Sequence, residues 1–264
     1  MTRSLEQKLF VLSRLGEILV RNVVPICEKD QRGYTCGHGT GLLVTYKSQN
    51  FLVTAAHVLD PLREGRRLYF PCSAQGERNI QGPALCTKAP DPADCNSDKI
   101  DIGVVKLDGE WQPPYPEVNK VALPFDCLTP GAVPRTGKQY FVTGFPATRV
   151  RAHIRNQQVE TRPYGNWCSS INDDEYQTKG LRPLQNFALS FDVKNVQADD
   201  GPTQSFPEPQ GLSGSPIWLL YDEHGENDPT TNQVVGILIE HRRADKLLVG
   251  TDIKFAIELI RQLS

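Results

Sequence analysis

A serine in a glycine-rich turn is the first residue whose surroundings suggest chemistry. The stretch Gly-Leu-Ser-Gly-Ser-Pro at residues 211–216 leads directly into an apolar run, so Ser213 stands in a sharp turn before a strand. Glycines allow such a turn to point backbone N–H groups inward. A nucleophilic hydroxyl in acyl transfer needs such N–H groups beside it, because they stabilise the oxyanion that forms. Taken alone, however, a Gly/Ser segment before a strand is usually only a turn.

Two upstream stretches supply the other groups that acyl transfer needs. His57 follows a short apolar strand at 51–53, and Asp101 precedes an apolar run at 102–107. In this chemistry a histidine takes the serine proton and a carboxylate fixes the imidazole tautomer. An unpaired aspartate at the head of a buried strand would be costly, so a histidine partner accounts for Asp101. The sequence therefore predicts His57 as general base, Asp101 as its orienting acid and Ser213 as nucleophile.

Each assignment has competitors in the sequence. Asp98 lies three residues before Asp101, but in a polar loop. Ser215 lies two residues after Ser213, beside a proline at the strand start, where we expect it to pack or to hydrogen-bond the turn. The remaining histidines have no acid at a telling spacing and are expected to be solvated or structural: His38, His153, His224 and His241.

With these stretches in the order His, Asp, Ser, the chain resembles the trypsin/chymotrypsin-like serine peptidases over roughly residues 22–263. The resemblance implies the three roles given above and places the backbone N–H groups of Gly211 and Ser213 in the oxyanion hole. Many secreted members have an aspartate directly before the nucleophile, where this chain has Leu212. Activation by clipping the N-terminus is therefore not expected. The Ser-Gly-Ser-Pro ending is similar to bacterial members of the family.

The resemblance also implies where the substrate's P1 side chain would bind. The family places the base of this pocket about six residues before the nucleophile and one wall in the segment after Gly236. Glutamate-preferring relatives carry a histidine two residues after that glycine, where this chain has a leucine, so an acidic P1 residue is the least expected. If one of the acids Glu208, Glu240 and Asp252 faced the pocket, it would favour Arg or Lys at P1. If all three point to solvent, the pocket is apolar; the sequence gives a slight preference to a basic P1 residue. The candidate pocket residues are Pro207, Glu208, Leu238, Ile239, Glu240 and His241.

Short apolar runs separated by turn residues fill most of the chain, which is typical of an all-β protein. We predict two six-stranded antiparallel β-barrels, at about 22–110 and about 135–250, followed by a closing helix at 255–263. The first barrel would use runs at 23–27, 41–46, 51–53, 67–70 and 102–107, and the second runs at 139–143, 187–193, 216–220, 233–239 and 247–254. Residues 72–99 are expected to be loop insertions and residues 111–116 the linker between the barrels.

An amphipathic helix is predicted before the first barrel. Residues 4–20 place leucines at three- and four-residue steps, which is the spacing of one helix face. We therefore expect an N-terminal extension at 1–21 and a peptidase-like domain at 22–264. The helix would either pack on the body or offer a docking site for a regulatory protein partner.

Composition excludes several classes of function. The 264 residues carry a net charge of −2 without a long basic or acidic run, so we expect neither nucleic acid nor an anionic membrane as partner. The seven cysteines form no C-x-x-C pair, so zinc is not expected. Their odd number, together with the lack of a recognisable signal peptide, predicts reduced thiols and a cytoplasmic protein. A disulfide such as Cys86–Cys95 remains the alternative.

Together these features predict an intracellular serine endopeptidase that acts on a restricted set of proteins through an acyl-enzyme. The chemistry requires no metal and no cofactor. The alternative is a binding or scaffold protein that kept the fold and lost turnover, although such a protein has no need for all three site residues. A non-peptidase esterase is less expected, because the motif Gly-x-Ser-x-Gly would need glycine where Ser215 stands.

Overall fold

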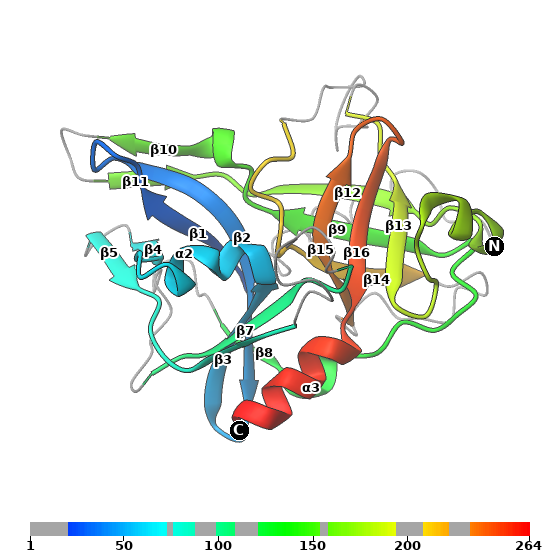
Figure 1. The fold of residues 1–264 in the computed structure, drawn as a ribbon, viewed down its shortest axis with the longest axis horizontal. Helices are drawn as coiled ribbons and strands as arrows, with labels where there is room; N and C mark the ends of the chain where they lie inside the picture. The colour runs from blue at the N-terminus through cyan, green and yellow to red at the C-terminus, as the bar shows by residue number, and fades with distance from the viewer. Residues whose placement is uncertain are drawn as a thin grey trace.

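Two antiparallel β-sheets make up most of the structure, a computed structural model (Figure 1). It describes residues 21–72, 76–87, 99–108, 121–153, 158–193, 208–221 and 233–264. The predicted N-terminal helix at 4–20 and the predicted linker at 111–116 lie outside these residues.

The first sheet has the strand order β5-β4-β1-β2-β3-β7-β6, and the short strand β8 pairs in parallel with β2. Its core is made mainly of buried valine, leucine, isoleucine and phenylalanine side chains, and the β-branched and aromatic ones among them favour a pleated surface. The bounds are β1 Val23–Lys29, β2 Thr35–Tyr46, β3 Gln49–Ala55, β4 Tyr69–Cys72, β5 Gly76–Asn79, β6 Ala84–Cys86, β7 Ile102–Lys106 and β8 Leu123–Pro124.

The second sheet has the order β12-β9-β14-β15-β16-β13. A β-bridge between Ser170 and Leu189 joins the ends of the two outer strands, so this sheet closes on itself and leaves no open edge there. The bounds are β9 Gln139–Gly144, β12 Tyr164–Ser169, β13 Asn186–Ser190, β14 Pro216–Tyr221, β15 Val234–Arg242 and β16 Leu247–Asp252. A separate hairpin is formed by β10 Val150–His153 and β11 Gln158–Thr161.

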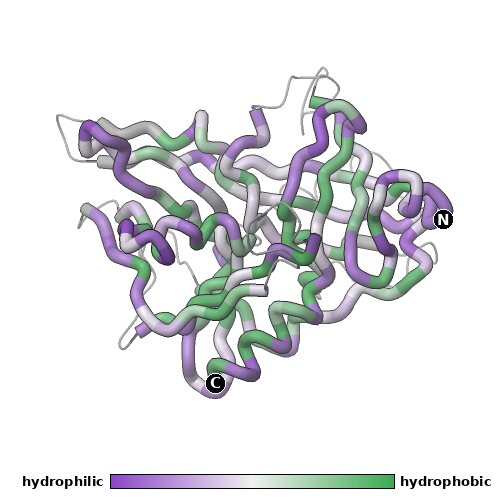
Figure 2. The backbone as a smooth tube through the Cα atoms, in the orientation of Figure 1, coloured by the Kyte–Doolittle hydropathy of each residue, from purple (hydrophilic) through white to green (hydrophobic). Residues whose placement is uncertain are grey.

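The C-terminal helix α3 (Lys254–Leu263) follows the last strand of the second sheet and packs on the first (Figure 1). Ala256, Ile257 and Ile260 are its buried residues, and Lys106 of β7 donates a hydrogen bond to the carbonyl of Leu263 at 3.2 Å. Hydrophobic residues gather along the inner strands and on this helix, whereas many turns are hydrophilic (Figure 2). The other helices in the described part of the chain are single turns: η1 Ala56–Leu59, α2 Asp60–Arg63, η4 Phe125–Cys127, η5 Ala147–Arg149, η6 Asp173–Glu175 and η7 Gln177–Lys179.

This architecture confirms the predicted all-β fold with a closing helix, and it corrects some details. The expectation that residues 72–99 form only loops was wrong, because β5 and β6 lie within them and pair with β4 and β7. Their short sequences carry little strand propensity, so pairing with a neighbouring strand decides their conformation. Among the described residues, β5, β6 and β8 bring the first sheet to eight strands, two more than predicted. Among the described helices, none is long and apolar enough to span a membrane.

Candidate active site

The pairing of β3 with β7 brings Asp101 to His57. Asp101 immediately precedes β7, and His57 lies in η1, which directly follows β3. The Asp101 carboxylate accepts two hydrogen bonds from His57, one from the backbone N–H at 2.9 Å and one from ring atom Nδ1 at 2.6 Å. The structure therefore joins the predicted base to its predicted acid.

The backbone of Asp101 is strained in a way that serves this contact. Its φ is +46°, a left-handed conformation that costs most residues roughly 1–2 kcal/mol but that aspartate adopts more readily than most. In this conformation its carbonyl also accepts a hydrogen bond from the N–H of Ala56 at 2.9 Å. Two residues later, Gly103 leaves space for η1, because a Cβ there would lie 2.7 Å from Leu59 Cδ1. Strain of this kind is typical of functional sites.

The electrostatics of the pair suit a general base. The His57 side chain is 44% exposed and that of Asp101 16%. Desolvation opposes the imidazolium, but the hydrogen bond and charge of Asp101, together with the charge of Asp60, outweigh it and raise the pKa of His57. Because the carboxylate accepts from Nδ1, neutral His57 carries its proton on that nitrogen and presents Nε2 as the acceptor.

Two left-handed glycines shape the turn that carries Ser213. Gly211 has φ +90° and Gly214 has φ +91°. Ser213 is partly exposed, whereas Ser215 is completely buried and its hydroxyl has no hydrogen-bond partner among the described residues. The Ser215 hydroxyl faces Gly144, where an added Cβ would lie 1.9 Å from it. These environments favour Ser213 over Ser215 as the residue that meets a substrate.

The turn leaves two backbone N–H groups unused. The carbonyl of Gln210 accepts a hydrogen bond from Ala147 at 2.7 Å, and the carbonyl of Leu212 accepts one from Ser215 at 2.9 Å. In a trans peptide the N–H points opposite to the C=O, so the N–H groups of the following residues, Gly211 and Ser213, point away from those donors. Neither N–H donates a hydrogen bond to another described residue. Two such groups are what an oxyanion would need.

The turn lies directly on β2 and β3. The carbonyl of Ser213 accepts a hydrogen bond from the N–H of Thr40 in β2 at 2.9 Å. Gly214 is so close to these strands that a Cβ would lie 1.9 Å from the carbonyl oxygen of Thr40 and 2.2 Å from the hydroxyl of Thr54 in β3. Since Thr54 precedes His57 by three residues, the serine turn is packed against the strand that leads to the histidine.

Comparisons with known proteins match solved structures at low sequence identity. Mouse neuropsin, a serine protease, is 14% identical, with 92% of this chain and 93% of that chain covered and a TM-score of 0.54. The chain has the trypsin-like two-barrel fold. A Glu endopeptidase structure is 15% identical over 90% of this chain and 89% of that chain, with a TM-score of 0.48. A structure from work on the Sesbania mosaic virus VPg protein is 14% identical over 91% and 90%, with a TM-score of 0.44. No family model matches the chain, and no curated protein matches it.

Within this trypsin-like fold, each acid near the predicted pocket already has a cationic neighbour. Glu240 is exposed and pairs with Arg242 at 2.9 Å, and exposed Glu208 lies 3.9 Å from Arg243. Asp252 is buried and forms an ion pair with the equally buried guanidinium of Arg135 at 3.0 Å. These contacts favour the apolar alternative for the pocket over the slightly preferred basic P1 residue.

The other pocket candidates are mostly apolar or neutral. Leu238 and Ile239 are buried, and Pro207 lies outside the described residues. The His241 ring meets Phe191 edge-on, with centroids 5.7 Å apart. Desolvation, aided by the charge of Arg243 and opposed by that of Glu208, lowers the pKa of His241. This lowered pKa favours the neutral form of His241.

Sequence reasoning missed a second histidine–acid pair. His38 Nδ1 lies 3.1 Å from Glu28 Oε1, because the pairing of β1 with β2 sets Glu28 opposite Cys36, two residues before the histidine. Ten residues separate the two in the sequence, and only the strand register brings them together. The competitor Asp98, and the histidine at 224, lie outside the described residues.

The cysteines that the structure describes as free thiols form no disulfide. Five cysteines are free thiols: Cys27, Cys36, Cys86, Cys127 and Cys168. Cys86 thus has no disulfide in the structure, while Cys95, its suggested partner, lies outside the described residues. Within the part of the chain that the structure describes, no group of three or more His, Cys, Asp or Glu side chains is placed to hold a metal ion.

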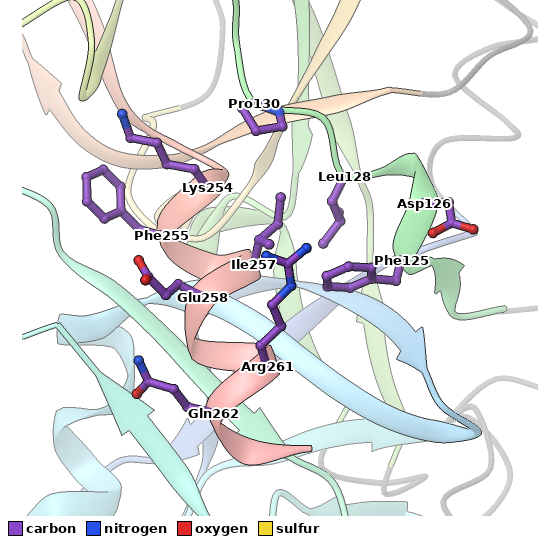
Figure 3. Close-up of a pocket in the computed structure, with 10 residues that line it drawn as sticks. All are labelled: Phe125, Asp126, Leu128, Pro130, Lys254, Phe255, Ile257, Glu258, Arg261 and Gln262. Atoms are coloured by element: carbon purple, nitrogen blue, oxygen red, sulfur yellow. The ribbon is translucent and has the colours of Figure 1, made fainter.

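An open groove of about 800 Å³ lies elsewhere, between α3 and η4 (Figure 3). Phe125, Leu128 and Ile257 contribute apolar surface, and the guanidinium of Arg261 lies 5.7 Å from the Phe125 ring centroid. None of the predicted site residues lines this groove. It is therefore separate from the candidate active site.

Proposed function

We propose that the chain is an intracellular serine endopeptidase of the bacterial trypsin-like type. The observation that carries the proposal is the double hydrogen bond from His57 to Asp101, made by an aspartate held in a left-handed conformation. The partly exposed Ser213 in its glycine turn supports the same reading, as do the two unused N–H groups beside it.

The chemistry follows from these groups. Ser213 Oγ attacks the carbonyl carbon of the scissile peptide bond while His57 Nε2 takes its proton, and Asp101 stabilises the imidazolium that forms. The N–H groups of Gly211 and Ser213 hold the oxyanion of the tetrahedral intermediate. His57 then gives the proton to the leaving amine, and the acyl-enzyme is hydrolysed by a water that His57 activates. No cofactor takes part in these steps.

Two structural features support an enzyme that works in a reducing compartment without clipping. The five described free thiols fit a cytoplasmic location. Leu212, at the position where many secreted relatives carry aspartate, is buried in an apolar cluster with Leu238 and Leu189. A leucine at this position has no carboxylate that could pair with a newly freed N-terminus. Control by a protein that docks on the predicted helix at 4–20 remains part of the proposal.

The substrates we propose are a restricted set of proteins cleaved after an apolar or small residue. This preference rests on the paired states of Glu208, Glu240 and Asp252. A carboxylate that already has a cationic neighbour is a weak attractant for an incoming Lys or Arg side chain. Mass spectrometry of cleavage sites in a denatured proteome digest tests it; cleavage mainly after basic residues would contradict it.

A fluorophosphonate probe tests the proposed activity directly, because it reacts with an activated serine. We expect labelling of the wild type at Ser213, none in Ser213→Ala, and a loss on the order of 10⁴-fold in rate for Asp101→Asn. Ser215→Ala is the matched control and should still be labelled. Labelling that persists in Ser213→Ala contradicts the assignment. A folded wild type without any labelling or cleavage favours the scaffold alternative.

A further inference from the structure

We propose that Thr40 is a positioning residue that fixes the oxyanion turn and joins it to the strand of the general base. The inference rests on the proposed function and names a part of the same site that the sequence motifs do not contain. Thr40 lies in β2, is completely buried, and touches neither the predicted base nor the predicted acid through any described hydrogen bond.

All the polar atoms of Thr40 are engaged. Its hydroxyl donates to the carbonyl of Gly211 at 2.8 Å and accepts from the N–H of Phe145 at 2.9 Å. Its backbone N–H donates to the carbonyl of Ser213 at 2.9 Å, and its carbonyl accepts from the hydroxyl of Thr54 at 2.7 Å. Thr40 thus holds the carbonyl groups of both residues whose N–H groups would form the oxyanion hole.

The hydroxyl matters because glycine has almost no conformational preference of its own. The peptide before Gly211 is anchored through the carbonyl of Gln210, which accepts from Ala147. The peptide after Gly211 is anchored by the N–H of Leu212, which donates to Pro209 at 2.9 Å, and by the Thr40 hydroxyl. With the hydroxyl removed, the Gly211 carbonyl loses this partner, and the N–H of Leu212 is the remaining described anchor of the peptide after Gly211. The dihedrals of Gly211 then gain freedom, and its N–H is held less firmly in the direction that an oxyanion needs.

The same residue connects the two sheets. Thr40 belongs to the first sheet, whereas Phe145, Gly211 and Ser213 follow or precede strands of the second. Thr54, which holds the Thr40 carbonyl, is also completely buried and lies three residues before His57. Two hydrogen bonds of Thr40 therefore link β3, which leads to His57, with the turn that carries Ser213. A displacement of about 1 Å between such groups can cost about 10²-fold in rate.

Three substitutions in β2 distinguish the effect of the Thr40 hydroxyl from the effect of its side-chain shape. Thr40→Val keeps the shape and removes the hydroxyl, whereas Thr40→Ser keeps the hydroxyl and removes a methyl group. Thr45→Val, on the same strand and only half-buried, is the matched control. We expect Thr40→Val to react with the fluorophosphonate about 10²-fold more slowly than the wild type at a temperature where both are folded. Thr40→Ser should remain within about tenfold of the wild-type rate even if its Tm falls, because the hydroxyl is retained.

The pH dependence separates positioning from a change in the base. Neither variant alters the contact between His57 and Asp101, so the pH at half-maximal labelling should stay at its wild-type value. Equal rates in Thr40→Val and the wild type overturn the inference. So does a Thr40→Ser variant that loses as much as Thr40→Val, because packing would then be the cause.

A second measurement does not depend on activity. In protein labelled with ¹⁵N-glycine, the amide resonance of Gly211 should broaden or split in Thr40→Val and remain single in Thr40→Ser. Gly33 and Gly65, which also have positive φ but lie in open space, serve as internal references. If the wild type itself is not labelled by the probe, the proposed function fails and this resonance alone decides the role of Thr40. If Thr40→Val does not fold, Thr54→Val takes its place, because it removes the hydrogen bond to the Thr40 carbonyl; an unchanged Gly211 resonance and labelling rate would contradict the inference.

Discussion

Asp101 lies directly opposite Ala56, one position beyond the ladder in which Ala55 of β3 faces Ile102 of β7. The register of these two strands therefore sets where the acid stands relative to the base. A shift of two residues in that register would keep every side chain on its own face and still separate Asp101 from His57.

The raised pKa of His57 predicts how activity depends on pH. Only neutral His57 can accept the Ser213 proton, so the labelling rate should rise with pH through an apparent pKa above the ordinary value of about 6.5. In Asp101→Asn the hydrogen bond and charge that raise this pKa are lost, so the residual activity should rise at lower pH. The rate of fluorophosphonate labelling between pH 5 and 9 measures both. A wild-type midpoint below that of Asp101→Asn would contradict the prediction.

The raised pKa of His57 also makes the stability of the folded protein depend on pH. A histidine whose pKa is raised in the folded state stabilises the protein fully at pH values below its unfolded pKa. That contribution disappears as the pH rises through the folded pKa. Asp101→Asn should therefore flatten the change in Tm across the same pH window.

Gly214 should tolerate no side chain, and Gly33 provides the matched control. Both have positive φ, but a Cβ at Gly33 meets nothing within 4 Å, whereas one at Gly214 would lie 1.9 Å from the carbonyl oxygen of Thr40. We expect Gly33→Ala to cost roughly 1–2 kcal/mol of unfolding free energy, the cost of the left-handed conformation alone. Gly214→Ala should cost on the order of 4 kcal/mol, because it adds a backbone clash. Urea unfolding compares them; equal costs would mean that the turn can move away from Thr40.

Breaking the buried ion pair of Arg135 and Asp252 should cost far more unfolding free energy than breaking an exposed ion pair. Asp252 also accepts a hydrogen bond from the N–H of Gly131 at 3.1 Å and one from Lys254 at 3.1 Å, at the start of α3. Asp252→Asn should cost about 3–5 kcal/mol of unfolding free energy, because it leaves a buried guanidinium without its counter-charge. Asp245→Asn, which breaks an exposed pair with a lysine, should cost less than about 1 kcal/mol. Similar Tm values for both variants would show that the buried pair is not a major source of stability.

The thiols should react with a maleimide in an order set by burial. Cys36 is exposed, whereas burial raises the pKa of Cys27 above its ordinary range and that of Cys168 to about 12. We expect modification of Cys36 in the native protein and protection of the other two until unfolding. After denaturation without reductant, all five described cysteines should react. A cysteine that reacts only after reductant is added would reveal a disulfide and contradict the reduced state.

Much of the candidate site was accessible from the sequence because its chemistry is local. His57, Asp101 and Ser213 each stand beside an apolar strand, where their residue types are conspicuous. Thr40 could not be found in this way, because its hydroxyl bonds a residue 171 positions away. The signal in the sequence is weak: a threonine between two glycines, Gly39 and Gly41, just before the apolar residues 42–44.

The fold was predictable to a similar extent and for a similar reason. Long apolar strands can be recognised from the sequence. In contrast, β5, with the sequence Gly-Glu-Arg-Asn, is a strand only because β4 lies beside it. The left-handed conformation of Asp101 is likewise imposed from outside, by the N–H groups of Ala56 and His57. The cause of β5 thus lies outside its own residues, and for Asp101 these contacts select a conformation that aspartate tolerates better than most residues.

The hydrogen bond from Thr40 to Gly211 joins the first sixth of the chain to its last quarter. During synthesis on a ribosome, β3 and β7 can pair, and His57 can meet Asp101, long before the serine turn has been made. The oxyanion turn acquires its partners only when Leu238, whose carbonyl holds Gly214, has also emerged. The proposed activity therefore requires the chain to have emerged at least as far as Leu238, and a shorter nascent chain would lack a complete oxyanion turn.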